Sequence, residues 1–219
     1  MRFLLIVWYI YYMQKDAPEG VFRTIDAAAR ALAVKDFTVD FQKKVGFEAY
    51  VAEYKTLYIF TDKRDLMLQL HIGHEVFHHF QNINGLLLKS GSKEEEEYME
   101  LVNFLTNPAT KLHHKWKLFR WDHERRAEAF GWVFADRYAN FFYKNNVFSN
   151  AEHTVALADN AEQARLKNAL PEDAQEVAGL QIEINRLHER YTSKYSFSID
   201  KALEFVFLKK PPYSFEFIQ

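Results

Sequence analysis

Two histidines stand four residues apart in an apolar stretch of the chain, and a glutamate directly follows the first of them. The stretch reads HIGHEVFHH over residues 71–79, so that His74, Glu75 and His78 form the pattern HExxH. Residues four apart on an α-helix differ by about 40° in direction and about 6 Å in height, so both imidazoles can reach one tetrahedral ion. The apolar residues between 66 and 80 predict a mostly buried helix, expected over residues 62–82.

Two further histidines flank this pattern. His79 is turned about 100° from His78 and is not expected to be a ligand. His71 lies nearly in line with His78, but its ring would be about 10 Å away along the helix axis, which is too far for the same tetrahedral site. His71 is expected either to contact the substrate or a metal ligand without binding the metal, or to be an ordinary hydrogen-bonded histidine.

The chain contains no cysteine, so any metal must be held by histidines and carboxylates. A catalytic zinc needs a third protein ligand and one open position for water. Glu124 is the candidate, because it begins a predicted helix over residues 121–144 on which the small residues Ala127 and Gly131 allow close approach to the HExxH helix. Glu128, one turn on, is placed to accept a hydrogen bond from a ligand imidazole. In the alternative interpretation, Glu124 pairs with a neighbouring arginine at a solvated helix start.

The pattern along the rest of the chain predicts an α+β fold, with a small mixed sheet packed on a helical core. Residues 47–61 are expected to form a hairpin that turns near residues 53–55, and residues 17–20 are expected to form a turn. Thr24 is expected to cap a helix over residues 24–32. Further helices are expected over 94–105 and 172–191, followed by a helical or extended segment over 198–208 and an aromatic segment over 213–218.

An apolar run over residues 3–13 resembles a signal peptide superficially, but it favours a buried strand. The run is shorter than the about 20 residues needed to span a bilayer, and no small-residue cleavage site follows it. The expected location is therefore the cytoplasm, without membrane attachment. The 28 basic and 30 acidic residues give a net charge of -2, which argues against direct binding of nucleic acid.

The two motifs together resemble the ImmA/IrrE family of metallopeptidases. That family joins an HExxH helix to a downstream helix of the form E-x-x-A-(N or D)-x-F-A, whose first glutamate completes the zinc site. Here Glu128 stands where the family has Asn or Asp, Gly131 replaces an alanine, and the stretch between the motifs is longer. The matching positions are His74, Glu75 and His78 in the first motif, and Glu124, Ala127, Phe130 and Gly131 in the second.

The resemblance implies a zincin-like minimal metallopeptidase domain over residues 1–150, with 151–219 as a C-terminal appendage that can pack on the same domain. Residues 84–117 are expected to be an insertion, acting as a lid, as a docking element for a partner or as a decoration. Residues 195–203 faintly resemble a helix-turn-helix segment that is common after this domain.

The function that the resemblance implies is a zinc-dependent endopeptidase, in which Glu75 takes a proton from a zinc-bound water. Family members cleave a specific DNA-binding repressor or regulator, often in phage, mobile-element or stress circuits, so a protein of that kind is the expected substrate. Two alternatives remain: a zincin-scaffold binding protein that acts as an antirepressor or as a toxin–antitoxin partner with little or no turnover, and direct DNA binding through residues 172–208. The oxyanion donor is left open among His71, His113, His114 and His123.

Overall fold

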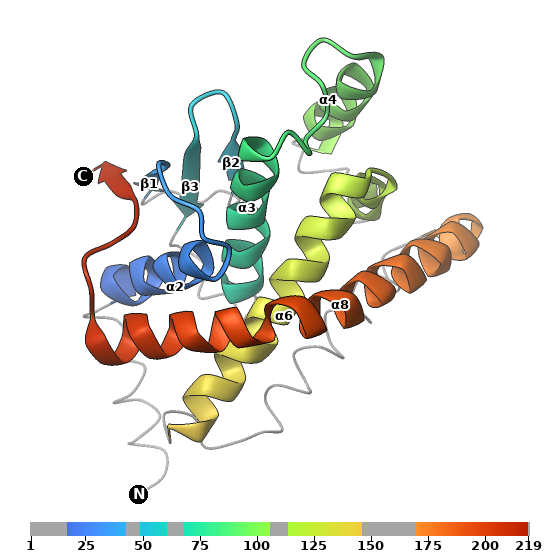
Figure 1. Cartoon of the computed structure of the whole chain (residues 1–219). Helices are drawn as coiled ribbons and strands as arrows, with labels where there is room; N and C mark the ends of the chain where they lie inside the picture. Colours follow the sequence, from blue (N-terminus) through green and yellow to red (C-terminus); the bar gives the residue numbers. More distant parts are fainter. Residues whose placement is uncertain (1–16, 43–48, 61–67, 106–113, 146–169, 219) are drawn as a thin grey trace, which may run out of the picture.

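A four-stranded sheet and a set of mostly longer helices make up the computed structural model, which describes residues 17–42, 49–60, 68–105, 114–145 and 170–218 (Figure 1). The chain is therefore mixed α+β and mostly helical, as predicted. The elements are α2 (Ala17–Ala31), β1 (Thr38–Gln42), β2 (Ala49–Val51), β3 (Thr56–Phe60), α3 (Leu68–Ile83), α4 (Lys93–Leu105), η1 (Lys115–Arg120), α6 (Asp122–Lys144), η2 (Pro171–Asp173), α8 (Ala174–Leu203), η3 (Glu204–Leu208) and β4 (Glu216–Ile218).

The sheet has the order β2-β3-β1-β4, with β2 on one edge. Strands β2 and β3 pair antiparallel and form the predicted hairpin, while β1 pairs in parallel with both β3 and β4. The sequence patterns missed β1, and the closing aromatic segment proves to contain the edge strand β4. The strand expected over residues 3–13 lies outside the described residues.

Helices α3 and α6 cross at very short distance, because a glycine stands at the crossing point. A Cβ atom on Gly131 would lie 2.6 Å from the carbonyl oxygen of Leu70 and 3.2 Å from the backbone nitrogen of His74. On the opposing helix, a Cβ on Gly73 would lie 3.1 Å from Cα of Gly131. The two glycines thus bring the HExxH helix against the start of α6, which is the approach expected from the small residues.

Helix α8 crosses both α6 and α2 and continues without a break where the sequence predicted an end near residue 191 (Figure 1). Its buried residues Tyr191, Tyr195, Ile199 and Leu203 recur at four-residue spacing, so one apolar stripe runs through the predicted boundary. The helix-turn-helix resemblance over residues 195–203 is wrong, because those residues lie within this single helix.

The start of α2 also corrects the sequence interpretation. The residues expected to form a turn at 17–20 are the first turn of the helix, where proline is tolerated because that position lacks an intrahelical partner. Thr24 is therefore no N-cap, and its hydroxyl donates to the carbonyl oxygen of Gly20 at 2.9 Å.

The C-terminal part packs on the rest of the described chain. Besides α8, the segment before β4 is tied to α2, since Arg30 Nη2 donates to the carbonyl of Pro212 at 2.7 Å. The backbone N–H of Ser214 donates to Asp26 Oδ1 at 2.9 Å. None of the described helices is long and apolar enough to cross a membrane.

Candidate metal centre

Two imidazole nitrogens and the carboxylate of Glu124 converge where α3 meets the start of α6. Nε2 of His74 lies 3.0 Å from Nε2 of His78 and 3.3 Å from Oε2 of Glu124. Nε2 of His78 lies 3.6 Å from Oε1 of Glu124. Ligand atoms on a tetrahedron around zinc are about 3.3–3.5 Å apart, given zinc–ligand distances of about 2.0–2.2 Å. These separations therefore fit one metal ion, and the His74–His78–Glu124 group can hold one.

The hydrogen bonds behind the two imidazoles decide which nitrogens face each other. Nδ1 of His78 is 2.8 Å from Oε1 of Gln81, whose amide nitrogen donates to the carbonyl oxygen of His123 at 2.9 Å. Nδ1 of His74 is 3.2 Å from Oε2 of Glu128. Both Nδ1 atoms are thus donors, and neutral rings direct their Nε2 lone pairs toward one another and toward a carboxylate. A cation is what such a set of acceptors requires.

The charge state of Glu124 agrees with this requirement. Burial alone would raise the pKa of Glu124, but positive charge on the adjacent His78 and His74 holds it well below its usual range. The side chain is only 6 % exposed, while those of His74 and His78 are 12 % and 10 % exposed. A buried carboxylate that stays ionised needs positive charge beside it, from protons on the imidazoles or from a metal ion.

Glu75, also on α3, interacts electrostatically with His74, His78 and Glu124 without belonging to the ligand group. Its Oε2 accepts a hydrogen bond from the backbone N–H of Tyr50 in β2 at 2.8 Å. Burial raises the pKa of Glu75, while His74, His78 and the Tyr50 N–H act in the opposite direction. A carboxylate with a raised pKa close to the ligands is suited to exchanging protons there.

Glu128 lies in the position expected for it. One carboxylate oxygen is at His74 Nδ1, and the other accepts the indole N–H of Trp132 at 2.9 Å. The glutamate side chain, longer than the Asn or Asp of the family motif, thus orients the ring of His74 and is itself held in place by Trp132.

The remaining histidines separate into different environments. His123 is buried beside the centre, with its ring centroid 5.8 Å from that of His78, and burial lowers the pKa of His123 to about 4. His71 is partly buried on α3 and does not belong to the possible ligand group of the described residues. The ring of His114 packs against that of Phe104, with 5.8 Å between the ring centroids. His113 lies outside the described residues.

Two groups at the centre were missed by the sequence analysis. Gln81 follows His78 by three residues, so helical spacing alone could have placed its amide beside that ring. The hydroxyl of Tyr98, on α4, donates to Oε1 of Glu124 at 2.6 Å. No local spacing signals that contact, because it depends on how α4 folds back over α6.

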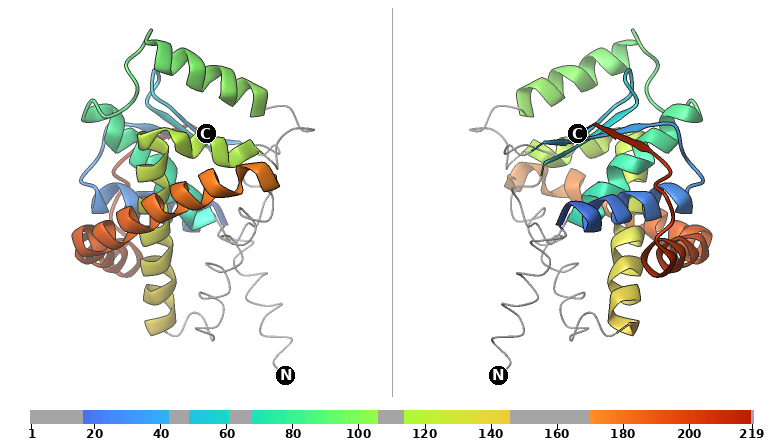
Figure 2. Two further views of the ribbon diagram at one scale, coloured as in Figure 1. Left: turned by 90° about the vertical axis from the view of Figure 1, so that its right-hand side faces the viewer. Right: turned by 90° about the vertical axis from the view of Figure 1, so that its left-hand side faces the viewer.

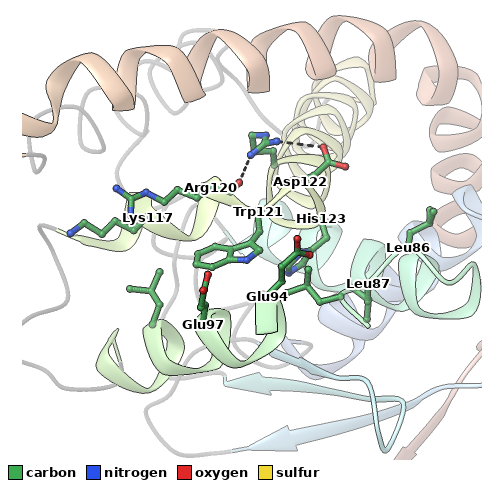
Figure 3. A pocket seen from close by; sticks show the side chains of 12 residues that line it. Leu86, Leu87, Glu94, Glu97, Lys117, Arg120, Trp121, Asp122 and His123 are labelled. Atoms are coloured by element: carbon green, nitrogen blue, oxygen red, sulfur yellow. Dashed lines mark hydrogen bonds and ion pairs between the residues drawn. The ribbon is translucent and has the colours of Figure 1, made fainter. Parts of the chain in front are cut away.

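A cavity of about 700 Å³ lies beside the centre, between α4, the segment before it and the start of α6 (Figure 3). Trp121 and His123 form the wall next to the centre, and Leu86 and Leu87 contribute an apolar side. Figure 2 shows α4 on one side of η1 and α8 on the other. Residues of α4 and of the segment before it line one side of the cavity.

In comparisons with known proteins, no family model, no curated protein and no solved structure matches this chain. The class of the site is therefore given by its own geometry, as a His-His-Glu group that can bind a metal ion.

Replacing Gln81 by leucine is expected to lower metal affinity by about 10–100-fold, because the partner that fixes the ring of His78 is lost. Stability should also fall by about 1–3 kcal/mol, since the His123 carbonyl loses its buried donor. Competition with a chelator and thermal unfolding measure the two effects. Gln181→Leu is the matched control, because the Gln181 amide bonds the solvent-exposed Asn185 on the same helix. Unchanged affinity in Gln81→Leu would contradict the assignment.

His79 is expected to make stability fall as the solution becomes acidic. Burial lowers the pKa of His79, whose Nε2 donates to the Lys35 carbonyl at 2.9 Å and whose Nδ1 accepts from the Tyr50 hydroxyl at 2.9 Å. The unfolded chain then binds the proton more readily, so the contribution is complete above the ordinary histidine pKa and is lost as the pH falls through the lowered value. The unfolding free energy of His79→Gln, compared with wild type between pH 8 and 5, should show a shallower slope; equal slopes would refute the expectation.

Proposed function

We propose that this chain is a zinc-dependent endopeptidase with a zincin-like fold, which acts in the cytoplasm on a specific protein. The observation that carries the proposal is the convergence of His74, His78 and Glu124 at near-tetrahedral separations, with Glu75 in electrostatic contact with all three. Two histidines and one glutamate form the ligand set of a catalytic zinc site, which keeps a position open.

Bound at these ligands, zinc would supply a Lewis acid and an acidified water. Glu75 is the residue that accepts the proton from the attacking water and delivers it to the leaving amine. The Tyr50 N–H steadies one oxygen of Glu75, so the other remains for this proton transfer. Gln81 and Glu128 keep both imidazoles in the tautomer whose Nε2 faces the centre.

The proposed substrate is a folded regulatory protein of the repressor type. This part of the proposal is supported by the resemblance of the two motifs to the ImmA/IrrE family. The cavity beside Trp121 and His123 offers room for a substrate side chain next to the ligands.

Zinc content and the appearance of new protein termini test the proposal together. Purified wild type should carry about one zinc per chain, and His78→Ala should carry almost none. Regulators encoded near this chain, and whole lysates, are then incubated with wild type and His78→Ala, and newly formed N-termini are labelled and sequenced. Termini produced by wild type alone support the peptidase; equal zinc in the two proteins would refute the site.

A binding protein with little turnover is the second candidate, and one observation favours it. Oε2 of Glu75 is already engaged by the N–H of Tyr50, as a carboxylate with a structural role would be. In that case wild type would form a stable complex with a regulator and leave it intact, and the complex would persist in Glu75→Gln.

A further inference from the structure

Helix α4 belongs to the segment expected to be an insertion, yet it reaches the candidate metal centre. The Tyr98 hydroxyl donates to Oε1 of Glu124 at 2.6 Å, the length of a charge-assisted hydrogen bond to a carboxylate.

The Tyr98 ring packs against two aromatic residues at the junction of η1 and α6. Its centroid lies 5.3 Å from that of Trp121 and 5.0 Å from that of His123, both edge to face. The hydroxyl is therefore fixed in direction and does not merely contact Glu124 from a loose surface helix.

The two oxygens of Glu124 have different neighbours as a result. Oε1 accepts the Tyr98 proton and lies 3.6 Å from Nε2 of His78 and from Nε2 of His123, while Oε2 lies 3.3 Å from Nε2 of His74 and receives no hydrogen bond from Tyr98. A carboxylate that binds a metal through both oxygens occupies an additional coordination position, and a hydrolytic zinc site needs that position for water or substrate.

We infer that Tyr98 is a positioning residue, which restrains Glu124 to one metal-binding oxygen and thereby couples the placement of α4 to the metal centre. The inference rests on the proposed metal site and deepens it. It gives the segment over residues 84–117 a defined role, because its helix then contributes to the coordination geometry.

Cobalt substitution tests the inference through coordination geometry and not through activity. Wild type loaded with Co²⁺ should show the intense visible absorption of a four-coordinate ion, and Tyr98→Phe should lose most of that intensity as Glu124 binds through both oxygens. Zinc affinity of Tyr98→Phe should fall by about 10–100-fold in competition with a chelator. Met99→Leu is the control, since Met99 is a 46 % exposed neighbour on the same helix and should leave both readouts unchanged.

A second measurement uses wild type alone and does not depend on a variant that folds. Zinc binding should slow hydrogen exchange of the α4 amides, because the ion fixes Glu124 and Glu124 fixes Tyr98. If wild type binds cobalt with four ligands but Tyr98→Phe has the same spectrum and affinity, the role of Tyr98 is refuted and the metal site stands. If zinc binding leaves the hydrogen-exchange rates of the α4 amides unchanged, the role of Tyr98 is also refuted. If wild type binds neither metal, the proposed function itself fails.

Discussion

The Glu75→Gln protein should keep its zinc and lose peptide cleavage by about 10²–10⁴-fold, because it loses the group that carries the proton. Zinc should remain, since the ligand group consists of other residues. The fold should remain as well, because the glutamine carbonyl can still accept the Tyr50 N–H. Zinc analysis and the rate of formation of a labelled product terminus measure the two effects.

Glu53→Gln is the matched control for this substitution, since Glu53 is exposed in the turn between β2 and β3. It should cleave at the wild-type rate. Burial raises the pKa of Glu75, so the acidic limb of the wild-type pH–rate profile should lie above the ordinary glutamate pKa. A Glu75→Gln protein that cleaves normally would remove Glu75 from the mechanism, and one that loses zinc would show that it acts as a ligand.

A methyl group added to Gly131 should destabilise the protein by about 1–3 kcal/mol and weaken metal binding. The new Cβ would lie 2.6 Å from the Leu70 carbonyl and 3.2 Å from the His74 nitrogen, and both are backbone atoms that cannot rotate away. Helices α3 and α6 must therefore separate, which moves Glu124 away from the two imidazoles. Chemical denaturation and chelator competition measure the two losses.

Gly179→Ala is the matched control, because this substitution is expected to raise the stability of the protein and not to lower it. Gly179 lies in α8, and an added Cβ would meet no atom within 4 Å. Alanine favours the helix by up to about 1 kcal/mol over glycine, so this variant should gain stability and keep its metal affinity. Losses of equal size at both glycines would show that close helix approach is not the cause.

The sequence predicted those parts of the centre that are encoded by spacing within one helix. His74 and His78 lie on one face because they are four residues apart. The small Ala127 and Gly131 correctly indicated that α6 approaches closely enough to present Glu124. The β2–β3 hairpin was equally local, since its turn and both strands lie within a dozen or so residues.

Features that depend on contacts between distant segments were not predicted. The five residues of strand β1 alternate polar and apolar, but so short a run depends on its pairing with β3 and β4 to be recognised as a strand. The Tyr98 hydroxyl reaches Glu124 only because α4 returns over α6. The start of α2 was missed for another reason: proline was taken as a turn signal where it stands in the first turn of a helix.

The pairing of Thr38 with Glu216 means that the sheet cannot be completed before residue 216 has been made. Strand β1 leaves the ribosome early, but one of its two neighbours is not made until residue 216, and pairing over such a separation requires closure of a very long loop. Helix α3 therefore exists in the nascent chain before the sheet beside it is complete.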